Sequence, residues 1–297
     1  DLVDGLEKEK RHGFLEVAYL VLFGKLPTEN EITQFKDYIK PLQYLPPGLN
    51  ETSILGFPSP SVMNKLQRVI LVLYGVDPNP DDISIPNVIR QSLDLIAKFP
   101  TIIAYSYQAM RHKLHGESLF VHPPNPELCC AENFLYMLRP DRSYTELEAD
   151  LLDLALVLHA EHGGGNNSSF TCQVVSSSHT DTYSAIAAAV GSLKGPLHGA
   201  ANSNVMSMMN NIKSNVKDWK DEDEISAYLE KIIKGEAHDK KGLVYGMGHA
   251  VYTKSDPRAI ILKNKAKILA EAKGRADEHQ IGRASCRERS VDLGGRR

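Results

Sequence analysis

Helical periodicity runs through nearly the whole chain and constrains its fold more than any other feature. The apolar stretch Phe14–Phe23 stops at Gly24, a residue that readily takes the left-handed conformation at a helix end. Thr28 and Glu31 then form a capping box that opens the next helix. No alternating apolar and polar run is long enough to build a sheet. The sequence therefore predicts an all-α, multi-helical fold.

Later segments repeat the same helical signals. Val62–Tyr74 is apolar at helical spacing and stops at a glycine. A helix from Ile85 towards Met110 contains Pro100, which we expect to kink or break it. Ser143 or Thr145 can cap the helix that follows.

Turns and loops separate these helices. Residues 77–82 supply a turn rich in Pro and Asp, and residues 122–127 form a loop. The composition shifts at residues 163–169, GGGNNSS, which we expect to form a flexible break. The next helix, Ser184–Leu193, is so rich in Ala and Gly that we expect it to pack closely against buried neighbours.

Charge and hydropathy exclude several classes of function. The 297 residues carry a formal net charge of -3, which is too small to indicate a nucleic-acid or anionic-membrane partner. No stretch approaches the roughly 18 apolar residues of a membrane span, and the charged N-terminus lacks a signal-peptide core. The four cysteines form no CxxC motif, so we expect neither a disulfide framework nor a metal site. Their use is typical of a reducing, cytoplasmic location.

The two ends of the sequence depart from this pattern. The chain does not begin with Met, so we expect a cut N-terminus. Residues 281–297 have no apolar periodicity, five arginines and a lone cysteine, and they resemble the translation of a sequencing-library adapter. We expect this segment not to be native and exclude it from the reasoning on fold and function. A genuine basic tail for nucleic acid is the alternative.

Three of the 11 histidines stand in unusual local settings. His162 lies where a helix meets a glycine-rich loop, and His198 lies between a Gly-Pro turn and an apparent helix. His249 follows two glycines, Gly246 and Gly248, which let backbone approach a ligand closely. Each setting has a structural alternative, such as an imidazole at the negative end of a helix dipole. The two glycines are too few for a nucleotide-binding loop.

The segments around these histidines resemble motifs of the citrate synthase family. GPLHGAAN and GMGHAVYTKSDPRA resemble the family's two histidine motifs, and LHAEHGGGN resembles its upstream substrate-binding segment. EVAYLVLFGKLPTENE and FPTIIAYSY are similar to parts of its large domain. The resemblance extends from about Leu6 to about Gly274, with all motifs in the family's order.

The resemblance implies a large helical domain over residues 1–198 and an incomplete small domain over residues 199–280. It implies a homodimeric acyltransferase of the tricarboxylic acid cycle that condenses acetyl-CoA with oxaloacetate and hydrolyses citryl-CoA. The coenzyme A thioester is then a substrate, and no cofactor is permanently bound.

The same resemblance assigns roles residue by residue. It implies that His198 and His249 are the catalytic residues and that His162 and Arg258 bind oxaloacetate. It also implies that the coenzyme A site is formed by Leu243, Val244, Gly246, Met247 and Gly248.

The reaction's chemistry suits these residue types. A developing enolate oxygen needs a preorganised hydrogen-bond donor. A neutral imidazole near a helix N-terminus can provide one, which suits His198. His249 is expected to donate to the oxaloacetate carbonyl. The guanidinium of Arg258 matches a carboxylate bidentately, and closing two domains over the substrates excludes water.

The family's catalytic base, an aspartate on a later segment, has no match in this sequence, and neither have the later arginines that complete the site. Asp256 and Asp277 stand in the wrong contexts to replace it. We therefore expect residues 1–297 to have little or no synthase activity and to expose apolar helix faces. Ala200 and His179 are smaller departures from the family pattern.

Three other functions stay open. A 2-methylcitrate synthase would use propionyl-CoA, and the volume of the acyl pocket separates it from a citrate synthase. A lyase would cleave citryl-CoA with similar contacts. A catalytically dead member could serve as a binding protein, although the joint presence of His198, His249 and Arg258 argues against this reading.

Overall fold

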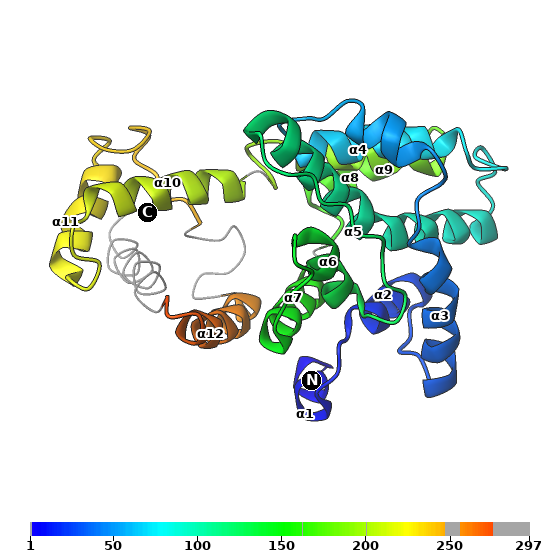
Figure 1. The fold of residues 1–297 in the computed structure, drawn as a ribbon, viewed down its shortest axis with the longest axis horizontal. Helices are drawn as coiled ribbons and strands as arrows, with labels where there is room; N and C mark the ends of the chain where they lie inside the picture. Colours follow the sequence, from blue (N-terminus) through cyan, green and yellow to red (C-terminus); the bar gives the residue numbers. More distant parts are fainter. Residues whose placement is uncertain (1, 162, 200, 247–255, 276–297) are drawn as a thin grey trace. The chain divides into compact units, whose positions relative to one another are not determined.

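The chain folds into helices throughout the part that can be described. The computed structural model describes residues 2–161, 163–199, 201–246 and 256–275, and none of these residues lies in a strand. The prediction of an all-α fold is therefore confirmed (Figure 1). The chain divides into two compact units, Asp1–Lys194 and Gly195–Arg297.

The first unit is built from helices joined by loops of different lengths. In chain order its described elements are α1 (Leu2–Glu9), α2 (Phe14–Phe23), α3 (Glu29–Leu42), the π-helical turn η1 (Asn50–Leu55), α4 (Val62–Tyr74), α5 (Ile85–His115), α6 (Cys130–Leu138), α7 (Glu146–His159), α8 (Asn167–Ser176) and α9 (Thr182–Leu193).

Local signals fix the ends of several of these helices. Thr28 caps α3, and its hydroxyl accepts a hydrogen bond from the Glu31 N–H while the Glu31 carboxylate accepts one from the Thr28 N–H, as the sequence predicted. Gly24 ends α2 with φ of 72°, in the left-handed region. Of the two caps proposed for α7, Thr145 is the one used.

We expected Pro100 to kink or break the long helix α5. The helix passes through Pro100 without a break, so the second of these two outcomes was wrong. A proline inside a helix removes one backbone hydrogen bond and costs about 3 kcal/mol. Burial on either side of Pro100 offsets this cost, because side chains such as Leu95 and Ile102 lie in the core of the unit. Packing against residues that are distant in the sequence therefore outweighs the local tendency of proline to break a helix.

The predicted small-residue helix is α9, and it packs closely as expected. A Cβ atom placed at Gly191 would lie 2.6 Å from Nε2 of Gln67 on α4, so only glycine fits there without displacing that side chain. The flexible break predicted at residues 163–169 is wrong over its last part, because α8 begins at Asn167.

The second unit has its own small core. Its described helices are α10 (Ala201–Asn215), α11 (Glu222–Ile233) and α12 (Pro257–Ala272). Met208 and Ile212 of α10 pack with Leu229 of α11, and Val244 joins the same cluster from the loop after α11. No residue of α12 is buried.

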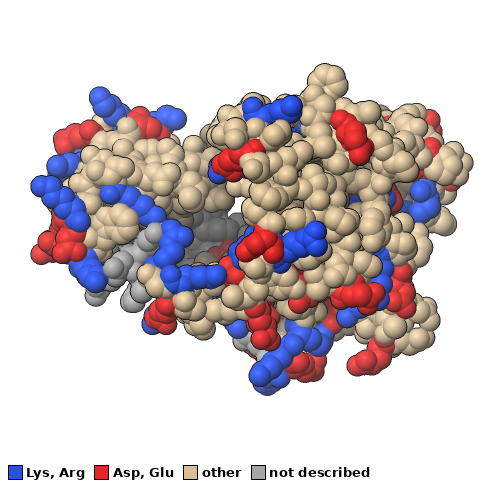
Figure 2. Space-filling model, viewed as in Figure 1, with Lys and Arg blue, Asp and Glu red and all other residues tan. Residues whose placement is uncertain are grey.

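Charged residues of both signs are interspersed on the visible faces of the two units, rather than gathered by sign (Figure 2). This distribution agrees with the small formal net charge of -3. None of the helices in the described ranges is long and apolar enough to span a membrane.

Candidate functional site

The predicted catalytic residue His198 lies in a tight turn directly before α10. Its backbone N–H donates a hydrogen bond to the Gly195 carbonyl at 3.0 Å, and its side chain is half-buried. The helix begins three residues later, at Ala201. The imidazole therefore belongs to a turn near a helix N-terminus.

The predicted coenzyme A segment is fixed to the same helix. Val244 is only 5% exposed and packs in the core of the second unit, which anchors the segment. Gly246 has φ of 81°, and a Cβ atom placed there would lie 3.1 Å from Cγ2 of Val205 on α10. Leu243 by contrast is 46% exposed, so its side chain is accessible for contact with a ligand.

Tyr245 lies between Val244 and Gly246 and holds the segment to the preceding loop. Its hydroxyl donates to the Asp239 carboxylate, and its ring meets the His238 ring edge-on with centroids 5.9 Å apart. This hydrogen bond lowers the pKa of Asp239 and raises the pKa of Tyr245. The backbone at residues 243–246 is thus held by burial, by a close glycine contact and by a charged hydrogen bond.

Arg258, the predicted oxaloacetate ligand, stands in the first turn of α12. Its Nη2 lies 2.7 Å from the Asp256 carboxylate, and its Nε lies 3.1 Å from each oxygen of that group. Asp256 also caps α12 by accepting the Arg258 backbone N–H at 2.9 Å. The Arg258 side chain is 36% exposed, so a substrate carboxylate can reach it, in competition with Asp256.

Four of the predicted site residues lie outside the described residues, namely His162, Met247, Gly248 and His249. The structure therefore brings the His198 turn and residues 243–246 to one helix, α10. The predicted meeting of His198, His249 and Arg258 around one substrate stays a prediction.

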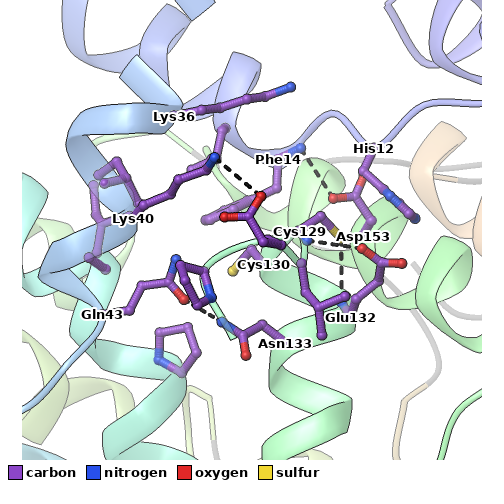
Figure 3. Close-up of a pocket in the computed structure, with 18 of the residues that line it drawn as sticks. His12, Phe14, Lys36, Lys40, Gln43, Cys129, Cys130, Glu132, Asn133 and Asp153 are labelled. Carbon is purple, nitrogen blue, oxygen red and sulfur yellow. Dashed lines mark hydrogen bonds and ion pairs between the residues drawn. The ribbon is translucent and has the colours of Figure 1, made fainter. Parts of the chain in front are cut away.

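Sequence reasoning missed a cavity in the first unit. It has a volume of about 500 Å³ and lies among α2, α3, α5, α6 and α7 (Figure 3). Asp153 of α7 points into it and accepts hydrogen bonds from the N–H groups of Gly13 and Phe14, at 2.7 and 3.3 Å. Burial raises the pKa of Asp153, although these two hydrogen bonds oppose the shift.

Two cysteines also line this cavity. Cys129 caps α6, with its sulfur 3.4 Å from the Glu132 N–H, and Cys130 is the first residue of the helix. Burial raises the pKa of both thiols, to about 12 for Cys130. Neither thiol is activated as a nucleophile, because a reactive cysteine needs a lowered pKa.

The sequence is similar to those of known citrate synthases and 2-methylcitrate synthases. Residues 1–287 match the family model of the citrate synthase C-terminal domain. The chain is 36% identical over 278 residues to a citrate synthase of Deinococcus radiodurans, a match that covers 93% of this chain and 68% of that protein. It is 32% identical over 257 residues to a 2-methylcitrate synthase of Shewanella oneidensis, covering 86% of this chain and 63% of that protein.

Solved structures of citrate synthases also resemble this chain. The citrate synthase of Pyrobaculum aerophilum superposes with a TM-score of 0.74 at 29% identity, over 92% of this chain and 65% of that one. The ternary complex of Thermoplasma acidophilum citrate synthase with carboxymethyl coenzyme A and oxaloacetate gives a TM-score of 0.76 at 25% identity, over 95% of this chain and 69% of that one. The chain thus spans about two thirds of the length of the proteins it matches, between 63% and 69% in these four comparisons.

Proposed function

Because the chain belongs to the citrate synthase family, an enzyme family, we propose that this protein condenses acetyl-CoA with oxaloacetate and hydrolyses citryl-CoA to citrate and coenzyme A. The observation that carries the proposal is the contact of Gly246 with Val205. It holds the proposed coenzyme A segment against α10, the helix that follows the His198 turn.

In this proposal the His198 imidazole donates a hydrogen bond to the thioester oxygen as the acetyl group loses a proton. The enolate that forms carries its charge on this oxygen, so a donor held in place by the turn and the helix stabilises the transition state more than the ground state. His249 donates to the oxaloacetate carbonyl that the enolate attacks, which neutralises the developing alkoxide.

Arg258 and His162 hold oxaloacetate in the proposed site. A guanidinium binds a carboxylate through two parallel hydrogen bonds, and the accessible Arg258 already forms such a fork with Asp256. Substrate binding then shares or replaces this internal pairing. The exposed Leu243 and the backbone of Val244, Gly246, Met247 and Gly248 contact coenzyme A.

The test is coenzyme A release, followed with a thiol reagent, by the product of the complete gene. Release that requires oxaloacetate is expected, and the variant His198→Gln is expected to lose about 100-fold or more in kcat. His115→Gln, at an exposed position at the end of α5, is the matched control and should leave the rate unchanged. Equal rates for the two variants would contradict the role of His198.

The polypeptide of residues 1–297 alone is proposed to turn over slowly or not at all, because no residue in it matches the family's catalytic aspartate. Without a base, the enolate that His198 stabilises does not form. Oxaloacetate-dependent release of coenzyme A by this polypeptide, at the rate of the complete protein, would refute this part of the proposal.

A second candidate is 2-methylcitrate synthesis from propionyl-CoA, since relatives with that name match the chain at 32% identity. One extra methylene in an apolar pocket changes binding by about 1–3 kcal/mol, which corresponds to about 10- to 200-fold. Comparing kcat/KM for acetyl-CoA and propionyl-CoA separates the two. A preference of tenfold or more for propionyl-CoA would favour this second candidate.

Self-association into a homodimer is part of the proposal. Large apolar side chains are exposed on the first unit, including Leu71 of α4 at 49% and Phe170 and Val174 of α8 at 58% and 52%. Phe170 and Val174 are four residues apart on one helix and share a face. Covering such side chains with a second copy would remove them from water. Sedimentation equilibrium of the complete protein tests this point, and a monomer would contradict it.

A further inference from the structure

Three side chains with metal-binding donor atoms meet at one end of the cavity in the first unit. They are His12, which precedes α2, and Cys129 and Glu132, which open α6. One ring nitrogen, the sulfur and one carboxylate oxygen all lie within 4.8 Å of one another. In Figure 3 these three residues lie on the right of the view, and Lys40 and Gln43 lie on the left.

Two of the donors are held in place by the start of α6. The Glu132 carboxylate accepts the Cys129 N–H at 2.9 Å, and the Cys129 sulfur accepts the Glu132 N–H at 3.4 Å. These reciprocal hydrogen bonds fix the sulfur and the carboxylate relative to each other. They also leave lone pairs on both groups, because a carboxylate offers about four acceptor positions.

The third donor comes from a histidine whose hydrogen bonding is incomplete. Its Nε2 atom is buried and makes no hydrogen bond within the described part of the chain, although an Asp150 carboxylate oxygen lies 3.2 Å away. A histidine that ligates a metal commonly directs its other ring nitrogen to a carboxylate. Asp150 faces Nε2, so it is such a partner when Nδ1 is the metal ligand.

We propose that His12, Cys129 and Glu132 bind one divalent cation of the zinc class. Imidazole, thiolate and carboxylate are the donors that Zn²⁺ takes in proteins, at about 2.0–2.3 Å. Ligand atoms at these distances around a tetrahedral ion lie about 3.3–3.8 Å apart. The three groups, now within 4.8 Å, therefore need to close by about 1.5 Å at most, within the reach of side-chain rotation.

Charge balance supports this choice of ion. On binding, the Cys129 thiol loses its proton to solvent, the Glu132 carboxylate is already ionised, and the imidazole binds in its neutral form. A thiolate, a carboxylate and a doubly charged cation then sum to zero. A neutral cluster can stand in a partly buried place where an isolated charge could not.

The ion would join two parts of the first unit that are distant in the sequence. His12 lies in the link between α1 and α2, and the other two ligands begin α6. Three protein ligands leave a fourth position, which a water molecule in the cavity can fill. The site is independent of the proposed substrate site, whose described residues belong to the second unit.

The test is Zn²⁺ binding to the chain of residues 1–297, prepared without a histidine tag and kept reduced, by titration against a competing chelator. Cys129→Ser and Glu132→Gln are suitable variants, because Ser and Gln preserve the capping hydrogen bonds and remove the thiolate and the charge. One equivalent of Zn²⁺ is expected for the unaltered chain, with affinity falling about 100-fold or more in either variant. Cys172→Ser, on α8, is the matched control and should bind like the unaltered chain.

Cobalt provides a second readout that identifies the sulfur ligand. Co²⁺ bound to a thiolate gives an intense near-ultraviolet charge-transfer band, which should appear in the unaltered chain and in Cys172→Ser and be absent from Cys129→Ser. Far-ultraviolet circular dichroism checks that each variant keeps its helices. Much less than one equivalent of bound Zn²⁺, or binding that survives both Cys129→Ser and Glu132→Gln, would overturn the proposal.

Discussion

Replacing Gly246 with alanine should destabilise the second unit, because this glycine meets two separate constraints. Its φ of 81° lies in the left-handed region, and a Cβ atom would lie 3.1 Å from Cγ2 of Val205. A non-glycine residue in the left-handed region costs about 1–2 kcal/mol, and slight overpacking adds about 1 kcal/mol. We therefore expect the free energy of unfolding to fall by about 2–3 kcal/mol.

Trp219 makes the measurement specific to this unit. It is the only tryptophan in the sequence, it packs against the core of the second unit, and its Nε1–H donates to the Val216 carbonyl at 3.1 Å. Urea unfolding followed by tryptophan fluorescence therefore reports the second unit alone, and a shift in midpoint at constant slope gives the change in stability.

Two controls separate the backbone constraint from the side-chain contact. Gly274 has φ of 66° but nothing within 4 Å of a Cβ position, so Gly274→Ala should show at most the backbone part. Adding Val205→Ala to Gly246→Ala should recover about 1 kcal/mol relative to the sum of the single changes. A loss in Gly246→Ala no larger than in Gly274→Ala, with no recovery in the double variant, would refute the proposed contact.

Three further predictions concern other residues. Asp153→Ala leaves the buried N–H of Gly13 without its 2.7 Å acceptor and should lower the free energy of unfolding by about 2–3 kcal/mol, with Asp153→Asn losing about half as much in thermal melts; equal losses would contradict the role of the side-chain oxygen as hydrogen-bond acceptor. Burial opposes the ionisation of Asp77, but hydrogen bonds from groups such as the Tyr183 hydroxyl outweigh it and lower its pKa to about 2. Because the folded-state pKa lies below the unfolded one, Asp77 contributes about 2 kcal/mol above about pH 4. This contribution is lost as the pH falls towards 2. The variant Asp77→Asn should therefore show a weaker dependence of its melting temperature on pH over that range. In the complete protein, Arg258→Lys should raise KM for oxaloacetate about tenfold or more, since an ammonium cannot form the bidentate fork; an unchanged KM would remove Arg258 from the site.

The sequence predicted the features that neighbouring residues decide. The capping box at Thr28 and Glu31 and the left-handed stop at Gly24 depend only on residues within one helical turn, and both form as expected. The continuous α5 shows the limit of such reasoning, because burial against distant helices keeps Pro100 inside the helix. The early start of α8 is a similar case, since a glycine-rich segment gives no local sign of where the helix begins.

In the candidate site, too, some features could be predicted from adjacent residues and others depend on how the chain packs. The turn at His198 and the helix after it could be predicted from adjacent residues. The contact of Gly246 with Val205 could not, because it depends on how the loop after α11 returns to α10. The cluster of His12 with Cys129 could not either, since these residues are brought together only by the packing of the first unit and no CxxC spacing signals it.

The central claim is that His198 stabilises an enolate made from acetyl-CoA for attack on oxaloacetate. The most direct measurement is the exchange of the acetyl-CoA methyl protons with deuterated solvent, in the complete protein bound to a non-reactive analogue of oxaloacetate. Exchange that slows about 100-fold or more in His198→Gln is the predicted result, because that variant loses the donor to the enolate oxygen. Exchange at an unchanged rate in His198→Gln, or no exchange in the unaltered protein, would contradict the account.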